Sequence, residues 1–390
     1  MFASTLGLVA LLAPYCSFGI GGLWLSVFGQ EGWRAIRWLR NSFKLVAFST
    51  LMVATALVMW AQLGPHDNFT EDLFMVLLVC IFGQASAELL AAKLQLESRY
   101  ASLAALPPIL HATRLTLLVV SGYLYDSGPS PSVAAYSFAA GSLLITLLGC
   151  AELSRMYVGD LALVGHGLKA RVAAHDLCIP SARLIARRAL PFGLTASLYL
   201  VYYQSDVVLL KYLQGDEAAG IYGAGFAVIA AVYVFPSVVY QRFMQPMLHR
   251  WAQFDALKFE RAYRAGSASM MLAGLLAAGV CALCADAVVS LVFGVGYEKT
   301  VTVLYVLSVA IPARFFGASA GASLSTGDHI AKKARILAVG ALVNVLINLT
   351  TIPAFGAMGA AVSTVVTETL IALLMHRYAK RNIFGSSKVT

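Results

Sequence analysis

The stretch Asp206–Trp251, DVVLLKYLQGDEAAGIYGAGFAVIAAVYVFPSVVYQRFMQPMLHRW, decides the fold of this chain. A short acidic turn at 214–217 joins two apolar runs, and the second run, of about 25 residues, is long enough to cross a bilayer. Pro236 lies in the middle of this run, and proline kinks or breaks a helix. The basic residues Arg242 and Arg250 follow. The stretch therefore predicts a membrane hairpin whose second helix is broken.

The composition extends this prediction to the whole chain. Of the 390 residues, 59% are hydrophobic and only 12% are charged, which is about half of the roughly 25% found in soluble domains. Such a chain cannot cover its surface with polar groups, so we expect an integral membrane protein. The formal net charge of +9 comes from basic residues dispersed between apolar runs. That dispersal argues against a nucleic-acid partner.

About eleven apolar runs are long enough to span a membrane, which predicts an all-α polytopic protein. A basic segment at 158–187 divides them into five and six. We expect an N-terminal bundle at 1–157, a cytoplasmic linker at 158–187 and a C-terminal bundle with a short basic tail at 188–390. The predicted spans are 3–27, 43–63, 73–95, 102–125, 132–157, 188–213, 218–246, 262–292, 300–325, 331–353 and 357–381.

The basic residues predict the topology. All but four of the 28 Lys and Arg residues fall in alternate connections or in the C-terminal tail, the exceptions being Arg114, Lys211, Lys299 and Arg314. Because positively charged connections stay on the cytoplasmic side, we expect the C-terminus inside and Met1 outside.

Motifs for catalysis are missing from the sequence. It contains no P-loop, no Ser/His/Asp set and no zinc motif, so we expect neither an enzyme nor ATP-driven transport. Cys281 and Cys284 have metal-like spacing, but no second pair or His cluster lies nearby in the sequence. We therefore expect no metal site and interpret both cysteines as helix-packing residues.

Several segments, through their order and spacing, resemble one family. The loop FGQEGWRAIRWLRNSFKL at 28–45, the hairpin pieces DVVLLKYLQGDEAAGIYGAGFAV at 206–228 and VFPSVVYQRFMQPML at 234–248, and NVLINLTTIPAFGAMGAAVSTVVTETL at 344–370 carry the resemblance. They are similar to the Wzx-type polysaccharide and O-antigen flippases of the MOP exporter superfamily. The family usually has twelve spans or more, and Met1 falls where the second would begin. We therefore expect the first transmembrane span to be missing from this chain.

The resemblance implies a MATE/MOP-like fold and a function. The function is the flipping of polyprenyl-diphosphate-linked oligosaccharide across the cell inner membrane, by alternating access, for polysaccharide biosynthesis. The expected partners are this lipid-linked oligosaccharide, membrane lipids, a polysaccharide polymerase and glycosyltransferases. No cofactor is implied beyond a coupling ion, H⁺ or Na⁺.

A diphosphate substrate calls for guanidinium or ammonium groups. Arg114 lies near the middle of the fourth predicted span and Arg314 near the middle of the ninth. Unpaired in lipid, each would cost several kcal/mol, so both are candidate substrate-binding residues. The alternative is an ion pair with Glu88, Glu152 or Glu368.

The sixth and last spans supply the other candidates. Tyr202, Tyr203 and Gln204 are the expected sugar contacts, with packing or membrane-belt aromatics as the alternative. Asp206 is a candidate for the coupling ion, or else pairs with Lys211 or snorkels to the interface. Glu368 is a second coupling candidate, or else makes a helix–helix polar contact.

Two alternative functions stay open at this point. A drug or cation antiporter of the same superfamily would need a cavity dominated by acidic residues, whereas the mid-span candidates Arg114 and Arg314 are basic. A membrane enzyme acting on polyprenyl-linked glycans would need sizeable loops outside the membrane, and the predicted outer loops are short.

Overall fold

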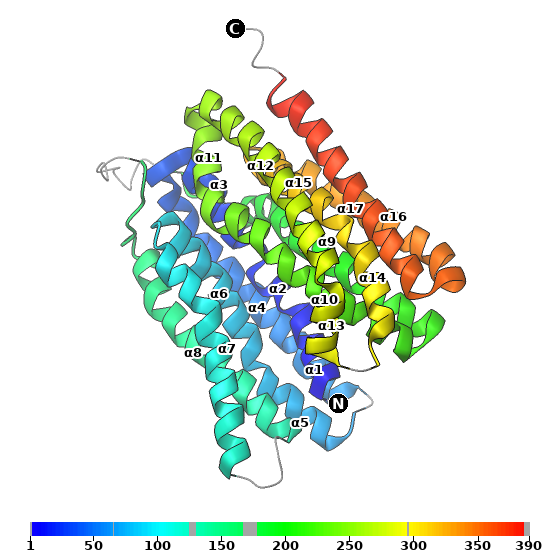
Figure 1. Ribbon diagram of the computed structural model, residues 1–390. Coiled ribbons are helices and arrows are strands. Elements are labelled where there is room, and N and C mark those ends of the chain that lie inside the picture. Colours follow the sequence, from blue (N-terminus) through cyan, green and yellow to red (C-terminus); the bar gives the residue numbers. More distant parts are fainter. Residues whose placement is uncertain (1, 65, 125–129, 167–177, 295, 386–390) are drawn as a thin grey trace. The chain divides into compact units, whose positions relative to one another are not determined.

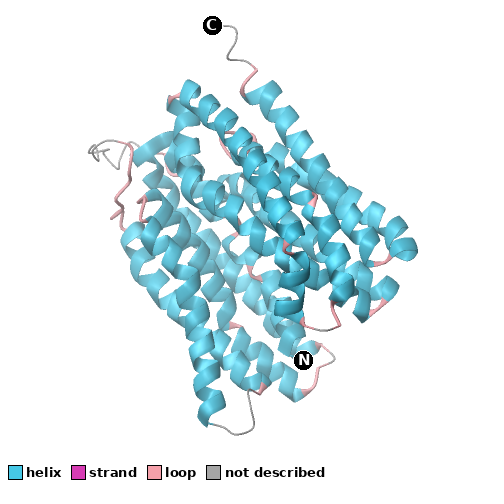
Figure 2. Ribbon diagram, viewed as in Figure 1, coloured by secondary structure: helices cyan, strands magenta, loops and turns pink. Residues whose placement is uncertain are grey.

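The structure is a computed structural model that describes residues 2–64, 66–124, 130–166, 178–294 and 296–385. Every regular element in these ranges is a helix, as Figure 2 shows. Helices satisfy all of their central backbone hydrogen bonds internally, which is what a chain surrounded by lipid requires. The expected all-α class is confirmed.

The chain forms two compact units, unit 1 at Met1–Ser197 and unit 2 at Leu198–Thr390. The boundary falls inside the helix α9 (Ala182–Gln214). Residues 167–177 of the expected linker lie outside the described residues, so the linker role of 158–187 stays a prediction. Its described part contains no helix before Ala182.

Unit 1 contains the helices from the N-terminus to the first part of α9, coloured blue to green in Figure 1. Their bounds are α1 (Phe2–Leu12), α2 (Pro14–Ser17), α3 (Ile20–Glu31), the 3₁₀ turn η1 (Gly32–Ala35), α4 (Ile36–Leu63), α5 (Asn68–Leu77), α6 (Val79–Leu96), α7 (Tyr100–Leu124) and α8 (Pro131–Tyr157). In this unit α8 packs against both α6 and α7.

Unit 2 contains the rest of α9 and the helices that follow. They are α10 (Asp216–Ser237), the π-helical turn η3 (Val238–Met244), α11 (Gln245–Phe254), α12 (Ala256–Leu283), α13 (Ala285–Phe293), α14 (Glu298–Ser308), α15 (Ala310–Ser323), α16 (Ile330–Phe355), α17 (Ala357–Tyr378) and the π-helical turn η4 (Ala379–Ile383). The main packing pairs are α12 with α15, α16 with α17, and α15 with α17.

The described helices identify a multi-pass membrane protein. Nine helical runs among the described residues are long and apolar enough to cross a membrane, and the bent pair α14–α15 makes a tenth. The first run, Thr5–Leu63, has 59 residues, about three times the roughly 20 that a bilayer needs. It covers two predicted spans, 3–27 and 43–63, which accounts for the difference from the expected eleven.

The first predicted span is not one continuous helix. Phe18 and Gly19 have left-handed φ angles of 50° and 73° and separate α2 from α3. A Cβ atom on Gly19 would lie 2.3 Å from the backbone nitrogen of Gly193 in α9. Only glycine allows so close an approach of two backbones in this conformation.

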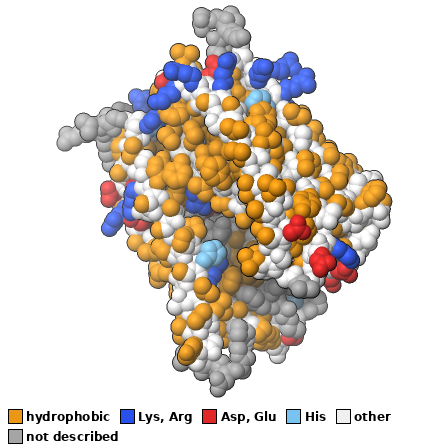
Figure 3. Space-filling view, in the orientation of Figure 1, with side chains coloured by type: hydrophobic (Ala, Val, Ile, Leu, Met, Phe, Trp, Pro, Cys, Tyr) orange, Lys and Arg blue, Asp and Glu red, His pale blue; other side chains and the backbone are white. Residues whose placement is uncertain are grey.

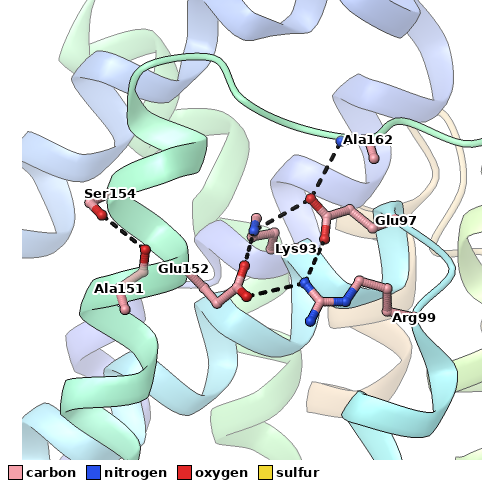
Figure 4. A network of polar contacts seen from close by, with 7 residues as sticks. All are labelled: Lys93, Glu97, Arg99, Ala151, Glu152, Ser154 and Ala162. Atoms are coloured by element: carbon pink, nitrogen blue, oxygen red, sulfur yellow. Dashed lines mark hydrogen bonds and ion pairs between the residues drawn. The ribbon is translucent and has the colours of Figure 1, made fainter.

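An ion-pair network joins α6 to α8 in unit 1 (Figure 4). Lys93 pairs with Glu97 at 3.4 Å and with Glu152, and Arg99 lies 3.2 Å from each of these carboxylates. The hydrogen bonds that Arg99 donates to Glu152 and Glu97 raise the pKa of its guanidinium. Two positive and two negative groups balance each other, so we interpret the network as structural.

The ninth predicted span is bent by 42° between α14 and α15. Pro312 explains the position of the break, because a proline ring clashes with the carbonyl four residues earlier, here at Ser308, where α14 ends. Pro312 also lies against α12, since a Cβ on Gly274 would come within 2.8 Å of the Pro312 Cα atom. The bend therefore lies directly before Arg314.

The hairpin at 206–251 has the expected tight turn and an irregular second helix. Gly215 begins α10 with a φ of 93°, which glycine adopts without strain. The second helix passes through the π-helical turn η3, which lies after Pro236 and before Pro246. Each proline removes one backbone donor, and the α-helical pattern is interrupted between the two prolines.

The surface of unit 2 agrees with a membrane environment. Large apolar side chains that are more than half exposed occur along its helices, including Leu275, Leu276, Leu342 and Leu346. In Figure 3 the apolar side chains form a broad area, and Lys and Arg side chains gather over the end of unit 2 where α11 and the end of α17 lie. Apolar surface of this extent needs lipid to cover it.

Candidate functional site

One face of α9 carries a row of aromatic and acidic side chains. Tyr199, Tyr202, Tyr203 and Asp206 occur at spacings of three, four and seven residues, which places them on the same side of the helix. Tyr202 and Asp206 are only 3% and 2% exposed. This row is the base of a buried polar cluster inside unit 2.

Asp206 is held by hydrogen bonds from three other helices. Tyr222 of α10 donates to Oδ2 at 2.5 Å, Thr364 of α17 donates to the same oxygen at 2.8 Å, and Asn348 of α16 donates to Oδ1 at 2.6 Å. All three partners are buried. No ion pair to Asp206 is present in the described part of the chain, so neutral donors alone stabilise this carboxyl group.

Asn344 extends this network one turn along α16. Its Oδ1 accepts hydrogen bonds from Asn348 and from Ser205, each at 3.1 Å, and its Nδ2 donates to Ser363 at 3.2 Å. The Oδ1 atom of Asn348 is buried and accepts no hydrogen bond from the described residues.

The cluster around Asp206 is therefore rich in oxygen atoms. Carboxylate, hydroxyl and amide oxygens are the ligands of hard cations, and a carboxylate can also take a proton. Within the described residues no three His, Cys, Asp or Glu side chains come together as a possible metal site. The arrangement suits a proton or an alkali cation.

Arg314 of α15 lies among three tyrosine rings. Its guanidinium carbon is 4.7 Å from the ring centroid of Tyr199, 5.6 Å from that of Tyr203 and 5.4 Å from that of Tyr233. A guanidinium nitrogen lies 3.8 Å from Glu368, and Arg314 donates no hydrogen bond within the described residues. A side chain that is only 13% exposed thus keeps five N–H donors unused.

Glu368 of α17 is the counter-ion of Arg314 and is loosely held. Its side chain is 2% exposed, and its Oε1 atom accepts no hydrogen bond from the part of the chain that the structure describes. The hydroxyl groups of Tyr202 and Tyr203 lie near this carboxyl group without a hydrogen bond of ordinary geometry. Glu368 therefore differs from Asp206, whose two oxygens both accept hydrogen bonds.

Two other expectations for α9 turn out differently. Lys211 pairs with Asp216 at 3.4 Å, with both side chains more than half exposed, so it does not pair with Asp206. Gln204 is exposed, and none of the contacts that form the cluster involves it. The structure therefore does not bring Gln204 together with Tyr202 and Tyr203.

Arg114 is the corresponding mid-helix arginine in unit 1. Its guanidinium lies 4.1 Å from the ring centroid of Phe138, and its Nε atom is buried without a hydrogen bond. The suggested acidic partners are occupied elsewhere, because Glu88 accepts a hydrogen bond from Ser17 at 2.6 Å and Glu152 belongs to the network with Lys93. Arg114 has no ion pair within the described residues.

The sequence reasoning missed the residues that complete the site. They are Tyr222 of α10 and, in α16, the two amide residues Asn344 and Asn348. Their spacing of four residues within an apolar run is a usable signal, since it puts two amides on one helix face.

Comparisons with known proteins give a match in structure alone. No protein-family model and no curated protein matches the sequence. One similar solved structure is an outward-facing conformation of a multidrug resistance MATE family transporter of the MOP superfamily, with a TM-score of 0.72 and 15% identity over 98% of this chain and 86% of that one.

Two further solved structures give the same result. A MOP superfamily transporter from Pyrococcus furiosus has a TM-score of 0.71 and 14% identity, with 98% of this chain and 86% of that chain covered. A mutant MATE transporter from Vibrio cholerae has a TM-score of 0.70 and 13% identity, with 98% and 89% covered. All three neighbours are transporters and none is an enzyme. The chain has the fold of the MATE transporters of the MOP superfamily.

Proposed function

We propose that this chain is an alternating-access transporter that translocates a polyprenyl-diphosphate-linked oligosaccharide across the cell inner membrane. The fold it shares with MATE transporters supports transport. The observation that carries the substrate class is Arg314, whose side chain is 13% exposed, lies 3.8 Å from one carboxylate and donates no hydrogen bond to any described residue. A phosphate group would accept two parallel hydrogen bonds from such a side chain.

The tyrosines around Arg314 support a sugar-bearing substrate. The hydroxyl groups of Tyr202, Tyr203 and Tyr233 are buried and form no hydrogen bond of ordinary geometry with the described residues. A buried polar group without a partner costs free energy, and sugar hydroxyl groups would supply partners. The segment 344–370, which resembles the flippases most, also contributes five polar residues to the cluster: Asn344, Asn348, Ser363, Thr364 and Glu368.

Asp206 is the proposed site of the coupling ion. Its carboxyl group is buried and accepts hydrogen bonds from Tyr222, Thr364 and Asn348, none of which carries a charge. Binding of H⁺ or Na⁺ there would change the charge of the cluster from negative to neutral. Such a change is a direct way to bias the conformation of helices that meet at this point.

A transport assay with a labelled polyprenyl-diphosphate oligosaccharide in proteoliposomes tests the substrate class. Arg314→Gln is expected to reduce the flipping rate about tenfold or more, the size of a lost charge-assisted hydrogen bond. Arg314→Lys keeps the charge but loses the bidentate hydrogen-bond geometry. Its flipping rate should therefore lie between the rates of the wild type and of Arg314→Gln. Lys211→Gln, which removes an exposed cation of unit 2 that lies outside the cluster, is the control.

The proposal fails if folded Arg314→Gln protein flips the lipid at the wild-type rate. A readout of protein level and thermal unfolding is needed beside the rate, because the substitution also leaves Glu368 without its counter-ion. The variant Arg314→Gln/Glu368→Gln removes both charges, so it separates the loss of substrate binding from the effect of an unpaired Glu368. If flipping returns in the double variant, the arginine served only to neutralise Glu368.

A specific observation favours a second candidate, the export of organic cations. Three tyrosine rings at 4.7–5.6 Å surround the positive charge of Arg314, with Glu368 beside it. Aromatic cages with an acidic residue also suit organic cations. This candidate predicts that a cationic dye is exported and that Arg314→Gln leaves this export unchanged or raises it.

A further inference from the structure

A groove with a basic rim lies between α16 and α17 at one end of unit 2. It has a volume of 710 Å³, and its lining includes Lys332, Arg335, Arg377 and Arg381 but no acidic residue. All four are exposed. None of them forms an ion pair within the described residues, although Lys332 lies 5.7 Å from the ring centroid of Tyr378. Four uncompensated cations therefore face a single concave surface.

The other charged groups near the groove do not neutralise it. Glu368 is the only acidic residue in α16, α17 and η4, and it is buried beside Arg314. Asp328, just before α16, makes no ion pair with the four cations. His329 contacts Tyr378 at 3.2 Å, and burial lowers the pKa of this histidine.

The inner wall of the same groove is apolar. Ile336, Val339 and Leu374 line it about one helical turn from the basic residues. Val339, Leu342 and Leu346 continue from there along one stripe of α16, and they are 48%, 60% and 55% exposed. In a membrane-spanning helix such a stripe is covered by acyl chains.

We propose that this groove binds an anionic phospholipid of the surrounding bilayer. The phosphate groups lie among Lys332, Arg335, Arg377 and Arg381, and an acyl chain follows the stripe that begins at Val339. Two features support a lipid over a soluble anion: the basic rim ends a membrane-spanning helix pair, and the apolar wall starts directly beneath it. Basic pockets between transmembrane helices are a recurring site for lipids with several phosphates.

Lipid titration of the purified full-length protein, followed by native mass spectrometry, tests the proposal. Cardiolipin, with two phosphates, is expected to bind at least tenfold more tightly than phosphatidylcholine. Arg335→Gln/Arg377→Gln should reduce cardiolipin binding about tenfold or more, and Arg335→Lys/Arg377→Lys should retain most of it. The control, Lys258→Gln/Arg261→Gln, removes two exposed cations from α12 and should leave binding unchanged.

Three results would overturn the proposal. If Arg335→Gln/Arg377→Gln and Lys258→Gln/Arg261→Gln reduced cardiolipin binding equally, the lipid would be attracted only by the overall charge of the protein. Equal binding of cardiolipin and phosphatidylcholine would show a surface without headgroup preference. Full displacement of cardiolipin by soluble pyrophosphate would assign the groove to a free anion. Because the substituted side chains are exposed, thermal unfolding of both variants should match that of the wild type and excludes misfolding as the cause.

Discussion

A carboxyl group that is 2% exposed inside a helix bundle must find its hydrogen-bond partners on neighbouring helices, and Asp206 finds them on three. The three donors satisfy its oxygens without any positive charge. A buried ionisable group in a membrane segment is a functional hypothesis by default. We expect a proton or a small cation as the ligand, because two hydroxyl groups and one amide group, none of them charged, contact the carboxyl group of Asp206.

Asp206→Asn should abolish coupling while the protein still folds. The amide has the size of the carboxyl group, and Asn348, whose Oδ1 atom has no partner, can turn its amide to accept from the new N–H group. If Na⁺ is the coupling ion, it should stabilise the wild type by about 2.7 kcal/mol at a concentration of 100 times its Kd. The variant should show no such gain.

Thermal unfolding in Na⁺ against K⁺ at constant ionic strength measures this difference, and flipping driven by a Na⁺ or a pH gradient measures the coupling. Asp216→Asn is the control, since Asp216 is an exposed acid on the same hairpin. An Asp206→Asn protein that still responds to both gradients as the wild type does would exclude Asp206 as the coupling site.

At the scale of elements, the broken helix α14–α15 positions Arg314 and depends on its contact with α12. The Cα atom of Pro312 would be 2.8 Å from a Cβ on Gly274, and the Phe315 Cβ would be 2.9 Å away. Backbone atoms cannot move aside as a flexible side chain can. The close approach of these two helices therefore requires glycine at 274, in the manner of small-residue contacts between transmembrane helices.

Gly274→Ala should destabilise the protein by about 1–3 kcal/mol, the usual cost of overpacking. Gly279→Ala is a matched control on the same helix, because a Cβ there meets nothing within 4 Å. The control should be neutral or more stable by about 0.5–1 kcal/mol, since alanine favours a helix over glycine. Denaturation of the two purified variants measures both values, and equal stabilities would contradict the packing argument.

At the scale of the whole molecule, the distribution of basic residues predicts which side of the membrane each end occupies. The rule acts during insertion and leaves no contact to observe in the folded chain. The expectation of a cytoplasmic C-terminus and an outer Met1 therefore stays a prediction. In the expected topology, the connection at 64–67 and the basic segment at 158–187 lie on opposite sides of the membrane.

Reporter fusions at Asp67 and Lys169 test this topology. A cytoplasmic reporter is expected to be active at Lys169 and silent at Asp67, and a periplasmic reporter should give the reverse pattern. Lys169 lies outside the described residues, so the fusion relies on the sequence alone. If the reporters placed Asp67 and Lys169 on the same side of the membrane, the predicted number of spans between these two residues would be wrong.

The sequence by itself determined the all-helical membrane fold, because apolar runs of about 20 residues leave the backbone no other stable state in lipid. It also indicated Asp206, Arg314 and Glu368, since charged residues stand out in apolar runs. It did not reveal that Phe18 and Gly19 break the first span, because that break depends on the approach of Gly193 from a distant helix.

Only the tertiary structure decided which of these charged groups meet. Asp206 and Thr364 are 158 residues apart in the chain, and Arg314 pairs with Glu368 instead of with an acid on its own helix. Such neighbours depend on the packing of α9, α10, α15, α16 and α17, which no local pattern encodes. The helical period predicts which side chains share one face of a helix. The packing of the helices determines which residues contact that face.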